Sequence, residues 1–324
     1  MDAVFEKIYE YGIIPVVTLE RANDAVPLAR ALSEGGLPVA EITFRTDAAA
    51  DAIRAIAAEL PGFLVGAGTV LTPKQAHDAI DAGAKFVVSP GINPAVVEYC
   101  LSREVPVMPG CATPTEIEQA LHYGLSAVKF FPAEQLGGLP MLRALAAPYR
   151  AVKFVPTGGV TLENLSAYAA NERVLAVGGS FAAPAELIAA GRFDEIAGLA
   201  RAAMFAMFDF SLAHVGINCG SPEEARAGAE LLCGLFGQDT RLGSGSVFVG
   251  GMLELMEKKY FGAHGHIGIA TATLERAMKY FLRLGYEFEP EGLLYGEDGK
   301  LRAAYIKGDF LGFALHLARK PAAK

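Results

Sequence analysis

The sequence predicts an α/β chain of two domains, a (β/α)8 TIM barrel followed by a smaller α+β domain. Three observations predict this fold class. Short β-rich runs alternate with helical runs from Ile13 to about Phe208, eight strand candidates lie in that region, and a βαβββ pattern occurs twice from Leu212 onward. Eight even βα units in roughly 200 residues are typical of a barrel, whereas a doubly wound open sheet, the alternative, rarely has so many. We therefore place the domains at residues 1–210 and 211–324.

Composition and charge limit the classes of function. The chain has 324 residues, enough for two domains, and 52% of them are hydrophobic. A formal net charge of -8 argues against nucleic acid as a partner, although a local site can still bind a phosphorylated small molecule. No run is apolar enough to span a membrane, residues 1–10 lack the apolar core of a signal peptide, and the four cysteines show no C-x-x-C spacing. We expect a cytoplasmic protein that acts on a small molecule, with no nucleic-acid or membrane partner.

The strand candidates of the barrel are short, and each precedes a helical stretch. They are Ile13–Leu19, Val39–Phe44, Leu64–Val70, Phe86–Ser89, Val105–Met108, Ala127–Phe131, Lys153–Pro156 and Val174–Val177. Proline follows Thr72, Asn93, Thr113 and Ala183, as it does near the first turn of many helices. Active sites of such barrels lie at the C-terminal ends of the strands, so the last residues of each strand are the first candidates.

One lysine, Lys129, lies inside the apolar strand candidate that runs from Ala127 to Phe131. A lysine amine attacks a carbonyl only after it has lost its proton, and burial among apolar neighbours favours the neutral amine. Such a lysine can form a Schiff base, which is the entry to class I aldolase chemistry. The alternative is a lysine at a strand end that reaches water by its long stem.

The second strand candidate carries polar residues with a period of two. Glu41, Thr43 and Arg45 share one face, which must point into the barrel because the other face is apolar. A buried carboxylate and guanidinium are costly unless they are paired or used, and a plain structural ion pair is the alternative. Arg45 can bind a carboxylate in a forked geometry, Thr69 of the third strand can donate a further hydrogen bond, and Glu41 can carry protons.

Two glycine pairs follow the last two strands of the barrel. They are Gly158-Gly159 and Gly178-Gly179, the second followed by Ser180. Many barrels bind phosphate at this place, on backbone N–H groups and a helix N-terminus. The alternative is a pair of tight turns.

Taken together, these motifs resemble the 2-keto-3-deoxy-6-phosphogluconate aldolase family, which includes 4-hydroxy-2-oxoglutarate aldolases. The resemblance covers about residues 1–208 and rests on Glu41–Thr46, Gly66–Val70, Ser89–Gly91, Lys129–Glu134, Pro156–Gly159 and Gly178–Ser180. It implies a homotrimeric class I aldolase that needs no cofactor and cleaves a phosphorylated keto acid to pyruvate and an aldehyde. It also implies the roles of the site residues: Lys129 as Schiff-base residue, Glu41 as general acid and base, Arg45 and Thr69 as carboxylate ligands, Pro90 and Phe131 as pocket walls, and Gly158, Gly159, Gly179 and Ser180 as phosphate ligands.

Lys153 is an internal rival for the nucleophile, because Val152–Pro156 echoes Val128–Pro132. It lies at the start of its strand, however, and therefore farther from the catalytic rim.

The region after Leu212 reads as strand, helix and further strands, twice. The first half has strands at Ala213–Asn218, Ser246–Gly250 and Met252–Glu257 and a helix at Pro222–Phe236; the second has strands at His266–Thr271, Arg302–Lys307 and Gly312–Ala318 and a helix at Leu274–Leu284. The halves match locally, because His214-Val215-Gly216 echoes His266-Ile267-Gly268 and Glu254 corresponds to His316. An internal repeat with a polar residue at each matching place predicts a pseudo-twofold site.

This region resembles the vicinal oxygen chelate family, which includes glyoxalase I and extradiol dioxygenases. The resemblance implies a divalent metal held by His214, Glu254, His266 and His316, with His264 as a competitor for His266. Three imidazoles and a carboxylate suit Zn, Fe, Ni, Co or Mn. The alternative is a metal-free module that packs on the barrel or makes an oligomer contact.

Three functions stay open at this point. The first is the aldolase, and the second is a phosphate-binding barrel with other chemistry, such as a synthase or an isomerase. The third makes the C-terminal domain the active part, as a metal-dependent lyase or dioxygenase or a ligand-binding regulator. Lys129 together with Glu41 and Arg45 favours the first.

Overall fold

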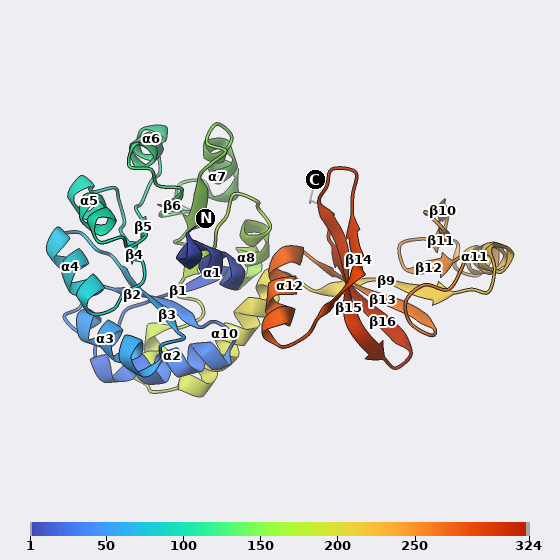
Figure 1. The fold of residues 1–324 in the computed structure, drawn as a ribbon, viewed down its shortest axis with the longest axis horizontal. Coiled ribbons are helices and arrows are strands. Elements are labelled where there is room, and N and C mark those ends of the chain that lie inside the picture. Colours follow the sequence, from blue (N-terminus) through green and yellow to red (C-terminus); the bar gives the residue numbers. More distant parts are fainter. Residues whose placement is uncertain (1, 322–324) are drawn as a thin grey trace. The chain divides into compact units, whose positions relative to one another are not determined.

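The computed structural model describes residues 2–321 and divides into two compact units, Met1–Met207 and Phe208–Lys324. The first unit is a barrel of parallel strands surrounded by helices (Figure 1). Its strands are β1 (Ile13–Val17), β2 (Val39–Thr43), β3 (Leu64–Gly68), β4 (Val87–Val88), β5 (Val107–Met108), β6 (Ala127–Phe130), β7 (Lys153–Pro156) and β8 (Val177–Gly179). Its helices are α1 (Ala3–Tyr11), η1 (Ala22–Asp24), α2 (Ala25–Glu34), α3 (Ala49–Glu59), α4 (Pro73–Asp81), α5 (Pro94–Ser102), α6 (Pro114–His122), α7 (Gly138–Ala146), α8 (Leu162–Ala169), α9 (Ala185–Ala189) and α10 (Phe193–Phe208).

Regular pairing joins most of the barrel, and single bridges close the rest. One sheet has the order β5-β4-β3-β2-β1-β8, and β6 pairs with β7. Gly110 bridges to Lys129 between β5 and β6, and Phe154 bridges to Val174 between β7 and β8. The strands therefore form a closed ring, as the alternation of strands and helices predicts.

Local sequence explains where the helices begin. Thr72, Asn93 and Thr113 are N-caps whose side chains accept a backbone N–H, and proline follows each at the first helical position. At α9 the proline, Pro184, is itself the N-cap, directly before the first turn.

Strand β7 has the predicted bounds, the other strands of the barrel are shorter than predicted, and the eighth lies later in the chain. Residues 174–176 are buried but make only a single bridge, and regular pairing with β1 begins at Val177 opposite Ile13. An apolar run therefore marks the buried segment correctly but does not show which of its residues pair.

Helix α1 packs beneath the barrel. Phe5, Ile8 and Tyr11 join one buried cluster with early residues of the strands, among them Ile14 and Val39. This cluster fills the N-terminal end of the barrel, so the opposite, C-terminal end is the one open to a ligand.

The second unit is built on one eight-stranded sheet of order β10-β11-β12-β9-β13-β16-β15-β14. Its elements are β9 (Ser211–Asn218), α11 (Pro222–Phe236), β10 (Thr240–Leu242), β11 (Ser246–Val249), β12 (Leu253–Met256), β13 (Gly265–Thr271), α12 (Leu274–Arg283), β14 (Phe288–Tyr295), β15 (Leu301–Phe310) and β16 (Phe313–Arg319). Counted outward from the central antiparallel pair β9 and β13, both halves run first, fourth, third and second strand. The predicted internal repeat is therefore present in the topology.

Sequence analysis located three strands in each half and missed one, β10 in the first and β14 in the second. Both are edge strands. All three residues of β10 are exposed, and β14 contains Pro290 and Gly292. Such residues are tolerated at an edge, where a strand pairs on one side only, and they hide the strand pattern.

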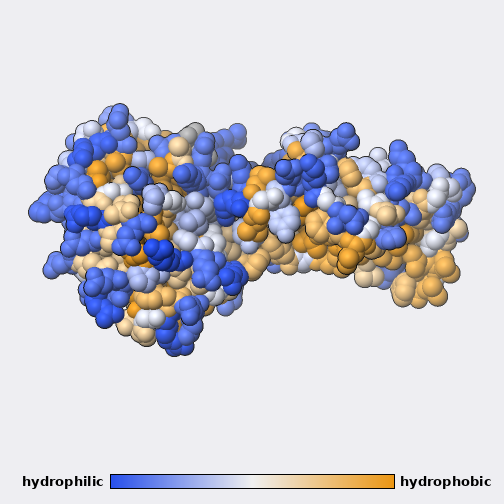
Figure 2. Space-filling model, turned by 60° about the horizontal axis from the view of Figure 1, so that its bottom comes forward, coloured by the Kyte–Doolittle hydropathy of each residue, from blue (hydrophilic) through white to orange (hydrophobic). Residues whose placement is uncertain are grey.

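The second unit has the smaller core. The cluster beneath α11 consists of Ala225, Ala229, Val247, Val249 and Leu255 with a few half-buried neighbours. Most of the exposed large apolar side chains among the described residues belong to this unit, and broad orange areas mark it in Figure 2. It therefore has less apolar burial than the barrel with which to stabilise its fold.

Candidate active site and metal centre

A buried ion pair lies inside the barrel, between β6 and β2. The Nζ atom of Lys129 is 3.2 Å from Oε1 of Glu41. The two residues are only 6% and 1% exposed. The backbone of Lys129 is fixed by β7 on one side and, on the other, by its N–H, which donates to the carbonyl of Pro109 at 2.9 Å. The pair predicted from the strand pattern is therefore brought together, and the lysine does not reach out to bulk water.

A glycine makes room for this carboxylate. A Cβ atom on Gly68, at the end of β3, would lie 2.1 Å from Oε1 of Glu41. Any other residue at this position would displace the side chain that faces Lys129. Glycine has no Cβ and therefore allows this close approach.

A cavity of about 560 Å³ opens beside the pair at the C-terminal end of the strands. Six of the predicted site residues line it, namely Arg45, Phe131, Gly158, Gly159, Gly179 and Ser180. The ring of Phe131, which lines this cavity, has its centroid 5.4 Å from Nζ of Lys129. Arg45 is exposed and makes no ion pair with any described residue, which leaves its guanidinium available to a ligand.

Four predicted site residues of the barrel are not among the described residues that line the cavity, namely Lys129, Glu41, Thr69 and Pro90. Thr69 and Pro90 follow β3 and β4 at the C-terminal end of the barrel. Thr69 has φ 55°, in the left-handed region that a branched residue rarely adopts. Its conformation is thus set by the turn after β3.

Glu134, to which sequence analysis assigned no role, contacts the glycine loop after β7 and helps to fix its conformation. The Glu134 N–H donates to the carbonyl of Gly158 at 3.1 Å, and the Glu134 carboxylate accepts a short hydrogen bond from the hydroxyl of Tyr168. Burial raises the pKa of Tyr168, so this hydroxyl stays a donor. Gly158 and Gly159 have φ of 95° and 78°, and a Cβ on Gly159 would lie 2.6 Å from Cβ of Glu134. The glycines are therefore required by the backbone and by packing.

Lys153, the rival lysine, lies at the first position of β7. Its Nζ atom donates to the carbonyl of Glu172 at 2.6 Å, away from Glu41. This placement agrees with the preference for Lys129.

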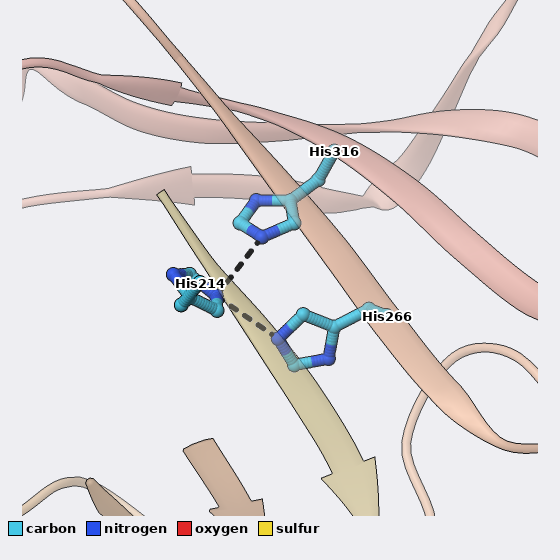
Figure 3. Close-up of side chains that lie close together, drawn as sticks. All are labelled: His214, His266 and His316. Carbon is cyan, nitrogen blue, oxygen red and sulfur yellow. Dashed lines mark hydrogen bonds between the residues drawn. The ribbon is translucent and has the colours of Figure 1, made fainter. Parts of the chain in front are cut away.

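In the second unit, three imidazoles converge on one point (Figure 3). The Nε2 atom of His214 on β9 lies 3.1 Å from Nε2 of His266 on β13 and 3.2 Å from Nε2 of His316 on β16. The carboxylate of Glu254 on β12 completes the set, with Oε2 at 3.3 Å from His214 and 3.2 Å from His266. Each half of the repeat contributes two of these four residues, as predicted.

This convergence is a poor hydrogen-bond network. A neutral imidazole has one N–H, so the single Nε2 proton of His214 cannot serve His266, His316 and Glu254 together. Lone pairs that face one another without protons are instead what a bound cation requires. The four groups therefore fit a divalent metal better than they fit one another.

Electrostatics favours the ligand forms of these groups. Burial lowers the pKa of His316 to about 3 and also lowers the pKa of His214, so both imidazoles are neutral at pH 7. Burial alone would raise the pKa of Glu254, but hydrogen bonds from His266 and Ser246 outweigh it, and the pKa falls. Neutral imidazoles and an ionised carboxylate are the forms that coordinate metals.

Glycines at matching places of the repeat make room for the rings. A Cβ on Gly216 would lie 2.1 Å from Cε1 of His266, and a Cβ on Gly268 would lie 2.7 Å from Nε2 of His316. His264, the competitor for His266, is exposed and packs against Phe313, outside the cluster.

Tyr305 is a neighbour of the cluster that sequence analysis missed. Its ring stacks on His316 with centroids 4.6 Å apart and an angle of 13° between the planes. The residue faces His316 across β15 and β16, a pairing that no short motif reveals.

The barrel and its buried lysine define a class of protein, the barrel enzymes that act on a carbonyl through an amine. The model of one family, described as KDPG and KHG aldolase (2-keto-3-deoxy-6-phosphogluconate and 4-hydroxy-2-oxoglutarate aldolase), matches residues 4–199. Because this match covers more than half of the chain, the protein belongs to that family and is an aldolase. The match ends before the second unit begins.

Individual relatives agree with this assignment. The chain is 58% identical over 201 residues to the 2-dehydro-3-deoxy-phosphogluconate aldolase of Treponema pallidum, which covers 62% of this chain and 96% of the relative. A Legionella pneumophila KDPG aldolase, solved with pyruvate captured as a covalent carbinolamine, has a TM-score of 0.60 at 38% identity and covers 61% of this chain and 97% of its own. The Zymomonas mobilis 2-keto-3-deoxy-6-phosphogluconate aldolase, solved with 3-phosphoglycerate, has a TM-score of 0.57 at 39% identity and covers 62% and 94%.

No helix among residues 2–321 combines the length and apolarity needed to cross a membrane.

Proposed function

We propose that the barrel cleaves 2-keto-3-deoxy-6-phosphogluconate to pyruvate and glyceraldehyde 3-phosphate, and 4-hydroxy-2-oxoglutarate to pyruvate and glyoxylate, with Lys129 as Schiff-base nucleophile. One observation carries the assignment of the nucleophile. The Lys129 amine is buried 3.2 Å from the Glu41 carboxylate and lies 5.4 Å from the ring of Phe131, which lines the same cavity as the glycine loops. A nucleophile and its base within hydrogen-bond reach are the signature of this kind of catalysis.

The distance between the two groups lets one carboxylate carry the protons of the reaction. Glu41 takes a proton from the Lys129 amine, which attacks the C2 carbonyl. Glu41 then protonates the departing hydroxyl of the carbinolamine, and the iminium ion forms. The Glu41 carboxylate, free again, takes the proton of the C4 hydroxyl, so the C3–C4 bond breaks, the aldehyde leaves and the bonding electrons move to the imine nitrogen. Glu41 returns this proton to C3, and addition of water to the iminium carbon releases pyruvate and free Lys129.

Residues at opposite ends of the cavity bind the two charged groups of the substrate. Arg45 and Thr69 bind the carboxylate beside C2, and Gly158, Gly159, Gly179 and Ser180 bind the phosphate. Arg45 has no partner among the described residues, and backbone N–H groups at such loops are suited to anions. In this proposal Pro90 and Phe131 form walls beside the reacting carbons, and of the two Phe131 lines the cavity described above. The Legionella pneumophila and Zymomonas mobilis complexes support a covalent keto acid and a phosphorylated ligand for the family.

Borohydride reduction in the presence of labelled pyruvate tests the nucleophile. The label is expected on the peptide that contains Lys129, because reduction fixes the imine as a stable amine. Label on another lysine, or no label, contradicts the assignment.

A homotrimer is part of this proposal, because the resemblance to the family implies it. Light scattering on purified protein is expected to give three times the chain mass of 34.1 kDa.

We propose a second function for the C-terminal unit, as a vicinal oxygen chelate domain that holds a divalent metal through His214, Glu254, His266 and His316. The converging Nε2 atoms, which cannot all be satisfied by one another, carry this proposal. A metal held there would supply Lewis-acid chemistry, as in a metal-dependent lyase or dioxygenase, or would order a ligand-binding regulator.

Metal analysis of purified protein tests the second function. We expect close to one equivalent of a first-row divalent metal per chain, and its loss in His266→Ala. His264→Ala is the matched control, because this exposed histidine two residues earlier lies outside the cluster. Equal metal content in both variants contradicts the site.

A further inference from the structure

Two hydroxyls that line the aldolase cavity, those of Thr18 and Thr157, have no role in the proposed mechanism. Thr18 follows β1 and lines the cavity together with Arg45 and Ser180. Strand β1 lies between β2, which leads to Arg45, and β8, which leads to Ser180. Thr18 therefore lies at the cavity wall between the two ends at which a substrate is held.

The hydrogen bonds of Thr18 have a fixed direction. Its Oγ1 lies 2.8 Å from Oγ1 of Thr43, and the Thr43 hydroxyl donates to the carbonyl of Val17 at 3.0 Å. A hydroxyl has a single proton, and a carbonyl can only accept. Thr43 is fully buried, so both contacts are satisfied only when Thr18 donates to Thr43 and Thr43 donates to Val17. The Thr18 oxygen then presents lone pairs, and no proton, to the cavity.

We infer that Thr18 is a specificity-determining residue that accepts a hydrogen bond from the C5 hydroxyl of the sugar acid. This inference rests on the proposed function. A substrate held by its carboxylate at Arg45 and by its phosphate at Ser180 places C4 and C5 between them. Both substrates carry a hydroxyl at C4, so the difference between them lies at C5, where 2-keto-3-deoxy-6-phosphogluconate has a hydroxyl that can donate. In 4-hydroxy-2-oxoglutarate, C5 is a carboxylate, which has no proton to give and is repelled by lone pairs. Thr18 therefore favours the polyhydroxy acid over the dicarboxylate.

The test compares Thr18→Val, which keeps the shape, with Thr18→Ser, which keeps the hydroxyl. Thr18→Val is expected to lower kcat/KM for the phosphorylated sugar acid roughly three- to tenfold, mainly through KM, because one neutral hydrogen bond is lost. The value for 4-hydroxy-2-oxoglutarate should stay level or rise. Thr18→Ser should keep the preference of the parent protein.

A second variant changes the direction of the hydrogen bonds of Thr18 without replacing a residue that lines the cavity. Thr43→Val removes the acceptor for the Thr18 proton, so Thr18 can donate to a ligand and the preference against the dicarboxylate should relax. Equal losses on both substrates in Thr18→Val, or an unchanged preference in both valine variants, would overturn the inference. Borohydride trapping of pyruvate distinguishes a failure of this inference from a failure of the proposed function. Absence of label on Lys129 in the parent protein would refute the proposed function, independently of the results for the Thr18 variants.

Discussion

Lys129 and Glu41 are opposite charges buried together, and this limits how the nucleophile can be tested. Truncation of the lysine would leave the carboxylate unpaired inside the barrel, at a cost of roughly 3–5 kcal/mol of stability. Arginine keeps the charge beside Glu41, but its guanidinium does not form an imine. An informative variant must therefore remove the primary amine and keep a positive charge beside Glu41.

Lys129→Arg is expected to lower kcat by roughly four orders of magnitude or more, because the imine path is lost, while the protein stays folded. Pyruvate formation and borohydride trapping measure the loss, and circular dichroism checks the fold. The matched control is Lys153→Arg, which should leave kcat within about twofold, since Lys153 contacts the carbonyl of Glu172 at the start of β7. Loss of activity in the control with retention in Lys129→Arg would reverse the two assignments.

Ser180 tests the phosphate end of the cavity. Ser180→Asp places a carboxylate where phosphate oxygens are expected and removes a donor, which is worth roughly 1.5–3 kcal/mol for a charged acceptor. KM for the phosphorylated substrate should rise about 10- to 150-fold, while KM for a non-phosphorylated 4-hydroxy-2-keto acid changes much less. Ser180→Ala is the control for the loss of the hydroxyl alone. Equal effects of Ser180→Asp on both substrates would mean that the glycine pairs are only turns.

At the residue scale, strand periodicity predicts part of the site and cannot predict the rest. Glu41 and Lys129 could be paired from sequence because alternate residues of parallel strands face the same interior. The bond between Tyr168 and Glu134 could not, since an isolated tyrosine on a helix has the pattern of a core residue. Thr18 was missed for a similar reason, because a single threonine in a strand is common.

At the scale of elements, the two halves of the second unit keep the same strand order and the same placement of polar groups. The strands β9 and β13 each carry a histidine followed two residues later by a glycine, and the fourth strand of each half carries the other ligand. The repeat could be read from sequence because His-x-Gly occurs twice. The edge strands could not, because β10 is exposed and β14 contains a proline.

Gly268→Ala tests the role of the glycine that follows the histidine in β13. A methyl group on Gly268 would lie 2.7 Å from Nε2 of His316 and 2.9 Å from Cε1 of His214, so the rings must move. Overpacking of this kind costs roughly 1–3 kcal/mol, which corresponds to about a 5- to 150-fold loss of metal affinity if the strain falls on the ligands. Competition with a metal-binding dye measures the affinity. Gly251→Ala is the control, because a Cβ there meets nothing within 4 Å. Equal affinity in both variants would show that the rings can move without cost to the metal.

On the scale of the whole molecule, the chain combines a barrel with a large core and a second unit with a small one. The four proposed metal ligands come from both halves of the repeat. A bound ion would therefore link β12, which contributes Leu255 to the small core beneath α11, to β13 and β16, whose described residues are not part of that core. A ligand that binds only the folded state stabilises it by mass action. Metal should therefore raise the unfolding temperature of the second unit, and calorimetry with and without the ion measures the shift.

The aldol reaction and the metal are expected to be independent. An imine on Lys129 withdraws the electrons of the breaking bond, so the barrel chemistry needs no ion, and the four proposed ligands belong to strands of the second unit alone. EDTA should remove the metal and leave kcat/KM for aldol cleavage within about twofold, and the double variant His214→Ala/His266→Ala should do the same. The metal content of the treated protein is the control, because an unchanged rate means nothing unless the ion has left. A complete loss of pyruvate formation on chelation, restored by a divalent ion, would show that cleavage depends on metal and that Lys129 does not suffice as the electron sink.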